Sequence, residues 1–204
     1  MTDPEAIVFV VDDDPSVRRA LQRLIRSAGF TVESFASAQE FLGLPRPDIP
    51  GCLVLDIHMP GVSGLDLQDE LAAAEVNLPI IFLTGYGTVP ASVRAMKAGA
   101  VDFLEKPVDD RALVVAIHQA VERNRRARLE QAEVREIQRR VESLSPRERE
   151  VFSLLLTGML NKQIASELGT TEKTIKVHRG RVMEKMQAGS MAELVRLAGK
   201  LGMR

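Results

Sequence analysis

Carboxylate, hydroxyl and ammonium side chains stand where short apolar runs of the sequence end. If those runs are parallel strands, their last residues converge on one edge of a sheet, where ligands bind at the point of strand-order reversal. Three carboxylates with one hydroxyl and one ammonium would there form a cation site beside a group that can accept phosphate. The set consists of Asp12, Asp13, Asp56, Thr84 and Lys106.

The three carboxylates suit Mg²⁺, or Mn²⁺ in its place, because this hard cation prefers oxygen ligands and keeps several waters. Close carboxylates repel one another, so a divalent cation is their natural neutraliser. With the cation bound, Asp56 can attack a phosphoryl group as a nucleophile and form an acyl phosphate. Lys106 would then offset the phosphate charge, and the Thr84 hydroxyl would hydrogen-bond one of its oxygens.

Taken singly, these residues have ordinary structural interpretations. A lone aspartate at a strand exit is usually a turn residue, and Lys106, which precedes Pro107, could be a loop lysine. Asp14 before Pro15 is typical of a helix N-cap, and we assign it no chemistry. The combination at four strand exits of one sheet favours the functional interpretation.

Short β-branched runs alternate with helical patterns up to about residue 121, which predicts βαβ units and a parallel sheet. The expected fold is a flavodoxin-like α/β domain with strand order 2-1-3-4-5. The predicted strands cover residues 6–11, 31–35, 51–55, 79–83 and 100–104. The predicted amphipathic helices lie at 17–25, 38–42, 65–71 and 93–96.

Charge is divided unevenly along the 204 residues. Residues 1–123 carry 10 Lys and Arg against 18 Asp and Glu, a net charge of −8, and residues 124–204 carry 17 against 10, a net charge of +7. The basic half is typical of a nucleic-acid binder. Cys52 is the only cysteine, which excludes an intramolecular disulfide and a cysteine zinc site. No targeting or membrane-spanning pattern is present, so we expect a cytoplasmic protein without a membrane partner.

Three segments follow from these patterns: a first domain at 1–122, a helical linker at 123–142 and a small all-α domain at 143–204. The linker is rich in Arg and Glu, with apolar residues spaced three or four apart. We favour a solvated connector helix over a dimerising coiled coil, because the apolar seam covers few heptads. Ser145 and Pro146, with Glu148 close behind, predict the start of a new helix.

Residues 161–169 form a short helical pattern that ends in glycine, and Thr170 and Thr171 can cap a second helix running to about Met186. On that second helix the apolar side chains share one face and the opposite face is cationic. Such a helix fits the DNA major groove, although a basic amphipathic helix that is merely solvated remains the alternative. Gly180, in mid-helix, suggests a close approach to another group or a tolerated weak spot.

Four sequence motifs resemble those of the receiver domain of two-component response regulators over about 120 residues: VFVVDDDPSVR, LVLDIHMPGVSG, IIFLTGYG and DFLEKP. The resemblance implies that Asp56 is phosphorylated, and that Asp12, Asp13 and the main-chain carbonyl of His58 join it around the metal. It also implies a phosphate-sensing set of Thr84 and Lys106, a cis peptide before Pro107, and a switch aromatic at Phe103. Many receivers carry tyrosine at that last position.

Residues 141–204 resemble the LuxR-type helix-turn-helix of NarL/FixJ-class regulators. The resemblance implies phosphate contacts from the first turn of the recognition helix, base contacts from its outward face, and a dimerisation role for the final helix. His178 is expected to be a core or phosphate-contacting residue. The implied DNA-binding residues are Thr171, Lys173, Thr174, Lys176, Val177, Arg179 and Arg181.

The leading hypothesis is a transcription factor that a sensor histidine kinase phosphorylates on Asp56. Phosphorylation would promote a homodimer that binds double-stranded promoter DNA and acts as an activator, with RNA polymerase as a further partner. The only enzymatic activity expected is the receiver's own phosphorylation and dephosphorylation. A Mg²⁺-dependent phosphohydrolase is the alternative, but such enzymes need a second aspartate where this chain has His58. A receiver with constitutive DNA binding is a third hypothesis.

Overall fold

A computed structural model describes residues 6–43, 45, 47–85 and 89–203. The chain divides into two compact units, Met1–Arg128 and Leu129–Arg204, each of which has its own hydrophobic core. In the described residues, no helix is both long and apolar enough to cross a membrane.

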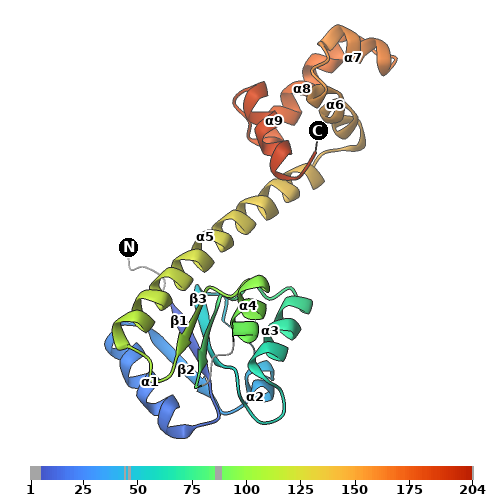
Figure 1. Ribbon diagram of the computed structural model, residues 1–204. Coiled ribbons are helices and arrows are strands. Elements are labelled where there is room, and N and C mark those ends of the chain that lie inside the picture. Colours follow the sequence, from blue (N-terminus) through green and yellow to red (C-terminus); the bar gives the residue numbers. More distant parts are fainter. Residues whose placement is uncertain (1–5, 44, 46, 86–88, 204) are drawn as a thin grey trace. The chain divides into compact units, whose positions relative to one another are not determined.

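The first unit is built on a five-stranded parallel sheet with the order β2-β1-β3-β4-β5, which confirms the predicted topology (Figure 1). The strand order reverses between β1 and β3, which are neighbours in the sheet. The strands are β1 Ile7–Val11, β2 Thr31–Phe35, β3 Gly51–Asp56, β4 Ile80–Thr84 and β5 Asp102–Glu105.

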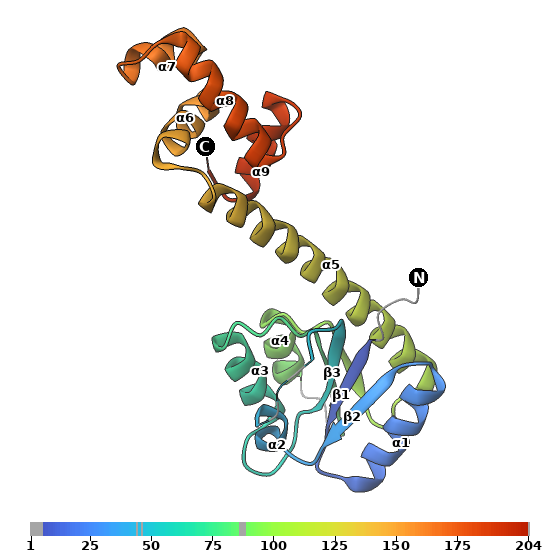
Figure 2. The same cartoon turned by 180° about the vertical axis from the view of Figure 1, so that it is seen from behind.

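Helices cover both faces of this sheet. Alternate residues of β1 point to opposite faces, so Phe9 joins the core under α2, α3 and α4, whereas Val10 joins the core under α1 and α5. Figure 2 shows the same two layers from behind. The helices are α1 Pro15–Ser27, α2 Ala38–Leu42, α3 Gly64–Ala73, α4 Val89–Lys97 and α5 Asp110–Glu142.

Two details of these helices bear on the predictions. Asp14 caps α1 as expected, because its side chain accepts the main-chain N–H groups of Ser16 and Val17. On α4, which contains the predicted amphipathic helix at 93–96, Ala95 is buried. Val93 is 44% and Met96 47% exposed, so the expectation of an apolar inner face was wrong for these two.

The helix α5 is a single uninterrupted element of 33 residues. Its first part belongs to the sheet domain, where Asn124 is buried and bonded to β3 and to the loop before β4. Its last part belongs to the second core, where Ile137 is buried and Val141 packs against it. The apolar residues that the sequence suggested for a solvated connector helix or a coiled coil are therefore partly buried in the core of the second unit.

The second unit contains four helices after α5: α6 Pro146–Leu156, α7 Asn161–Glu167, α8 Glu172–Met186 and α9 Met191–Lys200. The predicted start at Ser145 is present as a capping box, in which Ser145 and Glu148 each accept the other's main-chain N–H. Thr171 caps α8 by accepting the N–H of Thr174 at 3.2 Å. The buried residues Ile175, Val182 and Met186 fix the inner face of α8.

Candidate functional site

The strand register brings the predicted residues to one edge of the sheet. Val11 pairs with Leu55, so the next residues on these two strands, Asp12 and Asp56, lie beside each other. On the other side of β3, Asp56 pairs with Leu83, which precedes Thr84. Thr84 pairs with Glu105, and Lys106 follows directly.

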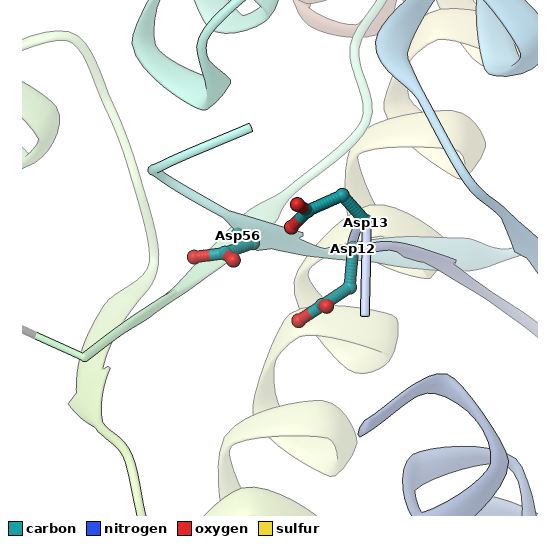
Figure 3. Close-up of side chains that lie close together, drawn as sticks. All are labelled: Asp12, Asp13 and Asp56. Carbon is teal, nitrogen blue, oxygen red and sulfur yellow. The ribbon is translucent and has the colours of Figure 1, made fainter. Parts of the chain in front are cut away.

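Three carboxylates meet at this edge. One oxygen from each of Asp12, Asp13 and Asp56 lies within 4.8 Å of the others. Figure 3 shows Asp12 and Asp13 leaving the end of β1 and Asp56 leaving the end of β3, with their carboxylates gathered together. Asp12 and Asp56 are buried, whereas Asp13 is exposed. The predicted acidic cluster is thus present, with one side open to solvent.

Lys106 inserts its ammonium between the two buried carboxylates. Its Nζ atom lies 2.7 Å from Oδ2 of Asp12 and 2.9 Å from Oδ2 of Asp56. Burial lowers the pKa of Lys106, but the hydrogen bonds to Asp12 and Asp56 outweigh it, so the net pKa is raised and the group stays charged. Burial raises the pKa of Asp12, and the Lys106 hydrogen bond opposes that effect.

The donor set fits a hard divalent cation. With Lys106 charged, one positive charge faces three carboxylates, which leaves a local charge of −2 when all three are ionised. Carboxylate oxygens are preferred ligands of Mg²⁺, and a partly open cluster leaves room for its waters. The residues present can therefore hold such an ion, with the exposed carboxylate of Asp13 on the solvent side.

The loop after β3 packs closely against Asp56. The main-chain N–H of His58 donates to Oδ1 of Asp56 at 3.3 Å, while the His58 side chain is exposed. A Cβ added at Gly64 would lie 2.2 Å from the main-chain oxygen of Asp56, so only glycine fits there. The peptide between Lys106 and Pro107 is cis, as the resemblance implied.

Thr84 is the last residue of β4, and Phe103 lies on the neighbouring strand β5. Thr84 is fully buried, and its carbonyl accepts the Lys106 N–H at 2.7 Å. Phe103 is half-buried and lies against Phe82, with the ring centroids 6.4 Å apart. The structure thus places the threonine and the aromatic residue on neighbouring strands.

Arg18 is a site residue that sequence reasoning missed. Its Nη1 atom donates to the main-chain oxygens of Asp12 at 2.7 Å and Asp13 at 2.9 Å. Arg18 belongs to the helix that Asp14 caps, and it reaches back over the turn that carries the carboxylates. The sequence gives no signal for this contact, because it does not show in which direction the Arg18 side chain points.

The outward face of α8 is a second candidate site, in the second unit. Ile175, Val182 and Met186 are buried on the inner face. The outer face carries exposed basic side chains and a half-exposed valine, as the sequence predicted. These exposed residues are Lys173, Lys176, Val177 and Arg181.

Other predicted residues of α8 are engaged within the unit. The hydroxyls of Thr171 and Thr174 lie 2.9 Å apart. Arg179 is half-buried and donates to Oδ1 of Asn161 at 3.2 Å, which ties α8 to α7. His178 is half-buried, and its Nδ1 atom has no hydrogen-bond partner among the described residues. A Cβ at Gly180 would meet nothing within 4 Å in the described part of the chain, so none of these residues approaches Gly180 closely.

An ion pair between the buried carboxylate of Glu148 and the ammonium of Lys185 connects α6 to α8. Lys185 donates to Glu148 at 2.6 Å and to the main-chain oxygen of Ser143 at 3.0 Å. The Lys185 hydrogen bond lowers the pKa of Glu148 to about 2, and the N–H of Ser145 adds to the effect. Glu148 thus caps α6 and anchors α8 at the same time.

Two protein families match the chain, one for each unit. Residues 8–118 match the family described as "Response regulator receiver domain", and residues 142–198 match the family described as "Bacterial regulatory proteins, luxR family". Together these two matches cover the acidic site and the outward face of α8.

Named relatives match over almost the whole chain. Nodulation protein W of Bradyrhizobium diazoefficiens is 52% identical over 198 residues, which cover 97% of this chain and 87% of that protein. Transcriptional regulatory protein FixJ of the same species is 47% identical over 197 residues, which cover 96% of each.

Solved structures of response regulators are also similar to this chain over nearly its whole length. The response regulator StyR is similar with a TM-score of 0.87 and 48% identity, over 96% of this chain and 99% of that one. Full-length FixJ from B. japonicum gives a TM-score of 0.59 and 45% identity, over 99% of this chain and all of that one.

Proposed function

Because the chain belongs to the two-component response regulators of the NarL/FixJ class, which join a receiver domain to a LuxR-type DNA-binding domain, we propose that phosphorylation of Asp56 controls its binding to DNA. The observation that carries the proposal is the convergence of Asp12, Asp13, Asp56 and Lys106 at one sheet edge. We further propose that residues 1–122 act as the receiver, 123–142 as a helical linker and 143–204 as the DNA-binding domain.

The chemistry at Asp56 follows from its surroundings. A carboxylate oxygen of Asp56 forms a bond to phosphorus while the phosphorus–nitrogen bond to a histidine of the partner kinase breaks. The imidazole leaves with the electron pair of that bond. Lys106, 2.9 Å from Asp56, stabilises negative charge on the transferred group, and the hydroxyl of Thr84 donates a hydrogen bond to a phosphoryl oxygen.

Mg²⁺, or Mn²⁺, is the cofactor that this donor set suits. The carboxylates of Asp12, Asp13 and Asp56 and the main-chain carbonyl of His58 would hold the ion. When bound, it supplies positive charge that neutralises phosphoryl oxygens during the transfer. The exposed side of the cluster at Asp13 gives the donor access to Asp56.

Phosphorylation is expected to act on the surface formed by α4 and β5. Thr84 moves toward the phosphoryl group and Phe103 follows into the space it leaves, while Lys106 keeps its contact with the site. Val93 and Met96 of α4 are 44% and 47% exposed, which gives this surface apolar area for a homodimer contact. To convert a mostly inactive population into a mostly active one, phosphorylation must favour the active conformation over the inactive one by up to roughly 5.5 kcal/mol.

The dimer would present two α8 helices to double-stranded promoter DNA, at half-sites about one DNA turn or a multiple apart. In this proposal Thr171, Lys173 and Thr174, at the start of the helix, contact phosphates. Lys176, Val177 and Arg181 face the bases. Arg179 contributes to the phosphate contacts from the edge of the helix. The exposure of the outer face supports this assignment.

A sensor histidine kinase is the expected donor, and RNA polymerase is the expected further partner of an activator. A regulator that binds promoter DNA works where the chromosome lies, so we place the protein in the cytoplasm. The receiver's only catalysis would be its own phosphorylation and dephosphorylation.

The test is selection of binding sites from random duplex DNA by the full-length protein, with and without a small phosphodonor and Mg²⁺. The phosphodonor should increase enrichment of a common sequence for the unmodified protein and leave Asp56→Asn unaffected. Equal stimulation of Asp56→Asn would reject the mechanism. A common sequence enriched without any phosphodonor dependence would favour constitutive DNA binding.

A further inference from the structure

The guanidinium of Arg18 is bonded to the main chain that carries two carboxylates of the acidic site. Its Nη1 atom donates to the carbonyl oxygens of Asp12 at 2.7 Å and Asp13 at 2.9 Å. Both residues follow Val11, the last residue of β1 that pairs with the neighbouring strands. Arg18 therefore supplies hydrogen bonds to carbonyl groups at the point where the sheet ends.

The two carboxylates on this main chain are held differently. Asp12 accepts the N–H of Asp14 at 2.9 Å and the ammonium of Lys106 at 2.7 Å. The carboxylate of Asp13 has no hydrogen bond or ion pair with any residue that the structure describes. The position of Asp13 in the cluster therefore depends on its main chain, and Arg18 binds that main chain at two successive carbonyls.

We propose that Arg18 is a positioning residue, which orients the main chain of Asp12 and Asp13 so that the Asp13 carboxylate faces a divalent cation. This inference rests on the proposed Mg²⁺ site. Arginine suits the role because its planar, permanently charged head offers fixed N–H directions to two acceptors. Arg18 acts through the main chain and does not touch the cation.

The charge of Arg18 and its positioning role predict opposite effects on Mg²⁺ binding. A fixed positive charge near the cluster repels a cation, so removing it should tighten binding if charge were its only contribution. If Arg18 holds Asp13 in place, removing it should weaken binding instead. Lysine at this position keeps the charge but has a shorter side chain and lacks the planar fork.

The experiment is calorimetric titration of the full-length protein with Mg²⁺ alone, comparing the unmodified protein with Arg18→Gln, Arg18→Lys and Arg19→Gln. Arg19 is the matched control, since it is exposed and its side chain contacts the hydroxyl of Ser16 at 3.3 Å, away from the acidic site. Loss of residues that orient metal ligands typically costs 10- to 100-fold in affinity, so we expect about tenfold weaker binding for Arg18→Gln. Arg18→Lys should change in the same direction, and Arg19→Gln should match the unmodified protein.

A second readout separates positioning from general damage to the fold. The rate of phosphorylation by a small phosphodonor is measured over a range of Mg²⁺ concentrations. In Arg18→Lys the half-saturating Mg²⁺ concentration should rise while the rate at saturation stays close to that of the unmodified protein. A purely structural role would lower the saturating rate and leave the Mg²⁺ dependence unchanged, which would overturn the inference.

Equal or tighter Mg²⁺ binding by both Arg18 variants would also overturn the inference while leaving the proposed site intact. If the unmodified protein binds no Mg²⁺, the proposed metal site itself fails, and the inference fails with it. Thermal unfolding of each variant without Mg²⁺ shows whether it is folded. Arg18→Lys decides the question if Arg18→Gln does not fold.

Discussion

The ammonium of Lys106 lies 2.9 Å from a carboxylate oxygen of Asp56, although 50 residues separate them in the sequence. The same ammonium contacts Asp12 at 2.7 Å, so one cation links the ends of β1 and β3 to the residue that follows β5. This contact joins the proposed phosphoacceptor to the strand that carries Phe103. A change in charge at Asp56 therefore acts directly on Lys106, which also contacts Asp12 at the end of β1.

Lys106→Met should bind Mg²⁺ at least about threefold more tightly, because a positive charge that competes with the ion has been removed. The measurement is calorimetric titration of the full-length protein with Mg²⁺. The same variant should lose the increase in DNA binding on phosphorylation, since the sensing contact is gone. Weaker Mg²⁺ binding by Lys106→Met would show that the ammonium is needed to hold the carboxylates in place.

Asn124→Ala should destabilise the first unit by about 1–3 kcal/mol, because the main-chain N–H of the buried Gly51 loses its partner and the carbonyl of Asn77 loses a donor. Asn124 accepts the N–H of Gly51 at 3.1 Å and donates to the carbonyl of Asn77 at 2.7 Å. Chemical denaturation of the full-length protein measures the loss. Gln119→Ala, an exposed change on the same helix, is the control and should have a small effect. Equal stability of the two variants would contradict the assignment.

The pair of Glu148 and Lys185 should make the stability of the second unit depend on pH. Folding lowers the pKa of Glu148 from 4.5 to about 2, so its contribution is fully present above pH 4.5 and is lost as the pH falls toward 2. Glu148→Gln should cost about 1.5–3 kcal/mol at pH 7 and much less at low pH. Scanning calorimetry at several pH values measures this.

Glu150→Gln is the matched control for that change, because Glu150 pairs with Arg147 at the surface. Exposed pairs of this kind contribute little to stability. We expect its unfolding temperature to follow that of the unmodified protein at every pH. If Glu148→Gln shows the same pH dependence as the control, the pair of Glu148 and Lys185 does not contribute to stability as proposed.

Lys176→Ala should weaken binding to an enriched DNA sequence by about 1–3 kcal/mol and relax the preference at one base position. The reason is that an exposed lysine on the outer face of α8 can donate to guanine in the major groove. Arg23→Ala removes one charge from the exposed surface of the first unit and serves as control. If Lys176→Ala weakens all sequences equally, the residue contacts phosphate and not bases.

Much of the receiver fold could be predicted because its signals are local. Each central strand is a short apolar run, and each site residue follows directly where such a run ends, as Asp56 follows Leu55. In a parallel sheet the carboxyl ends of all strands lie at the same edge, so this arrangement does not depend on side-chain contacts. The caps at Asp14, Ser145 and Thr171 are local for the same reason, since each side chain binds a main-chain group two or three residues away.

Tertiary contacts were not predictable in the same way. The apolar residues Val93 and Ile137 both stand in helical patterns, yet the first is 44% exposed and the second is 1% exposed. Spacing shows which residues share a face but not what covers that face. Asn124 gave a weak signal, because it lies seven residues after the buried Ile117 on the same stripe. Arg18 gave no sequence signal, because its partners are main-chain carbonyl groups, which every residue carries.

The central claim is that Asp56 accepts a phosphoryl group, and intact-mass spectrometry tests it most directly. The full-length protein and Asp56→Ala are incubated with a small phosphodonor and Mg²⁺. We predict one added phosphoryl group on the unmodified protein and none on the variant. The claim is contradicted if the variant gains the group equally, or if the unmodified protein gains none although it binds Mg²⁺.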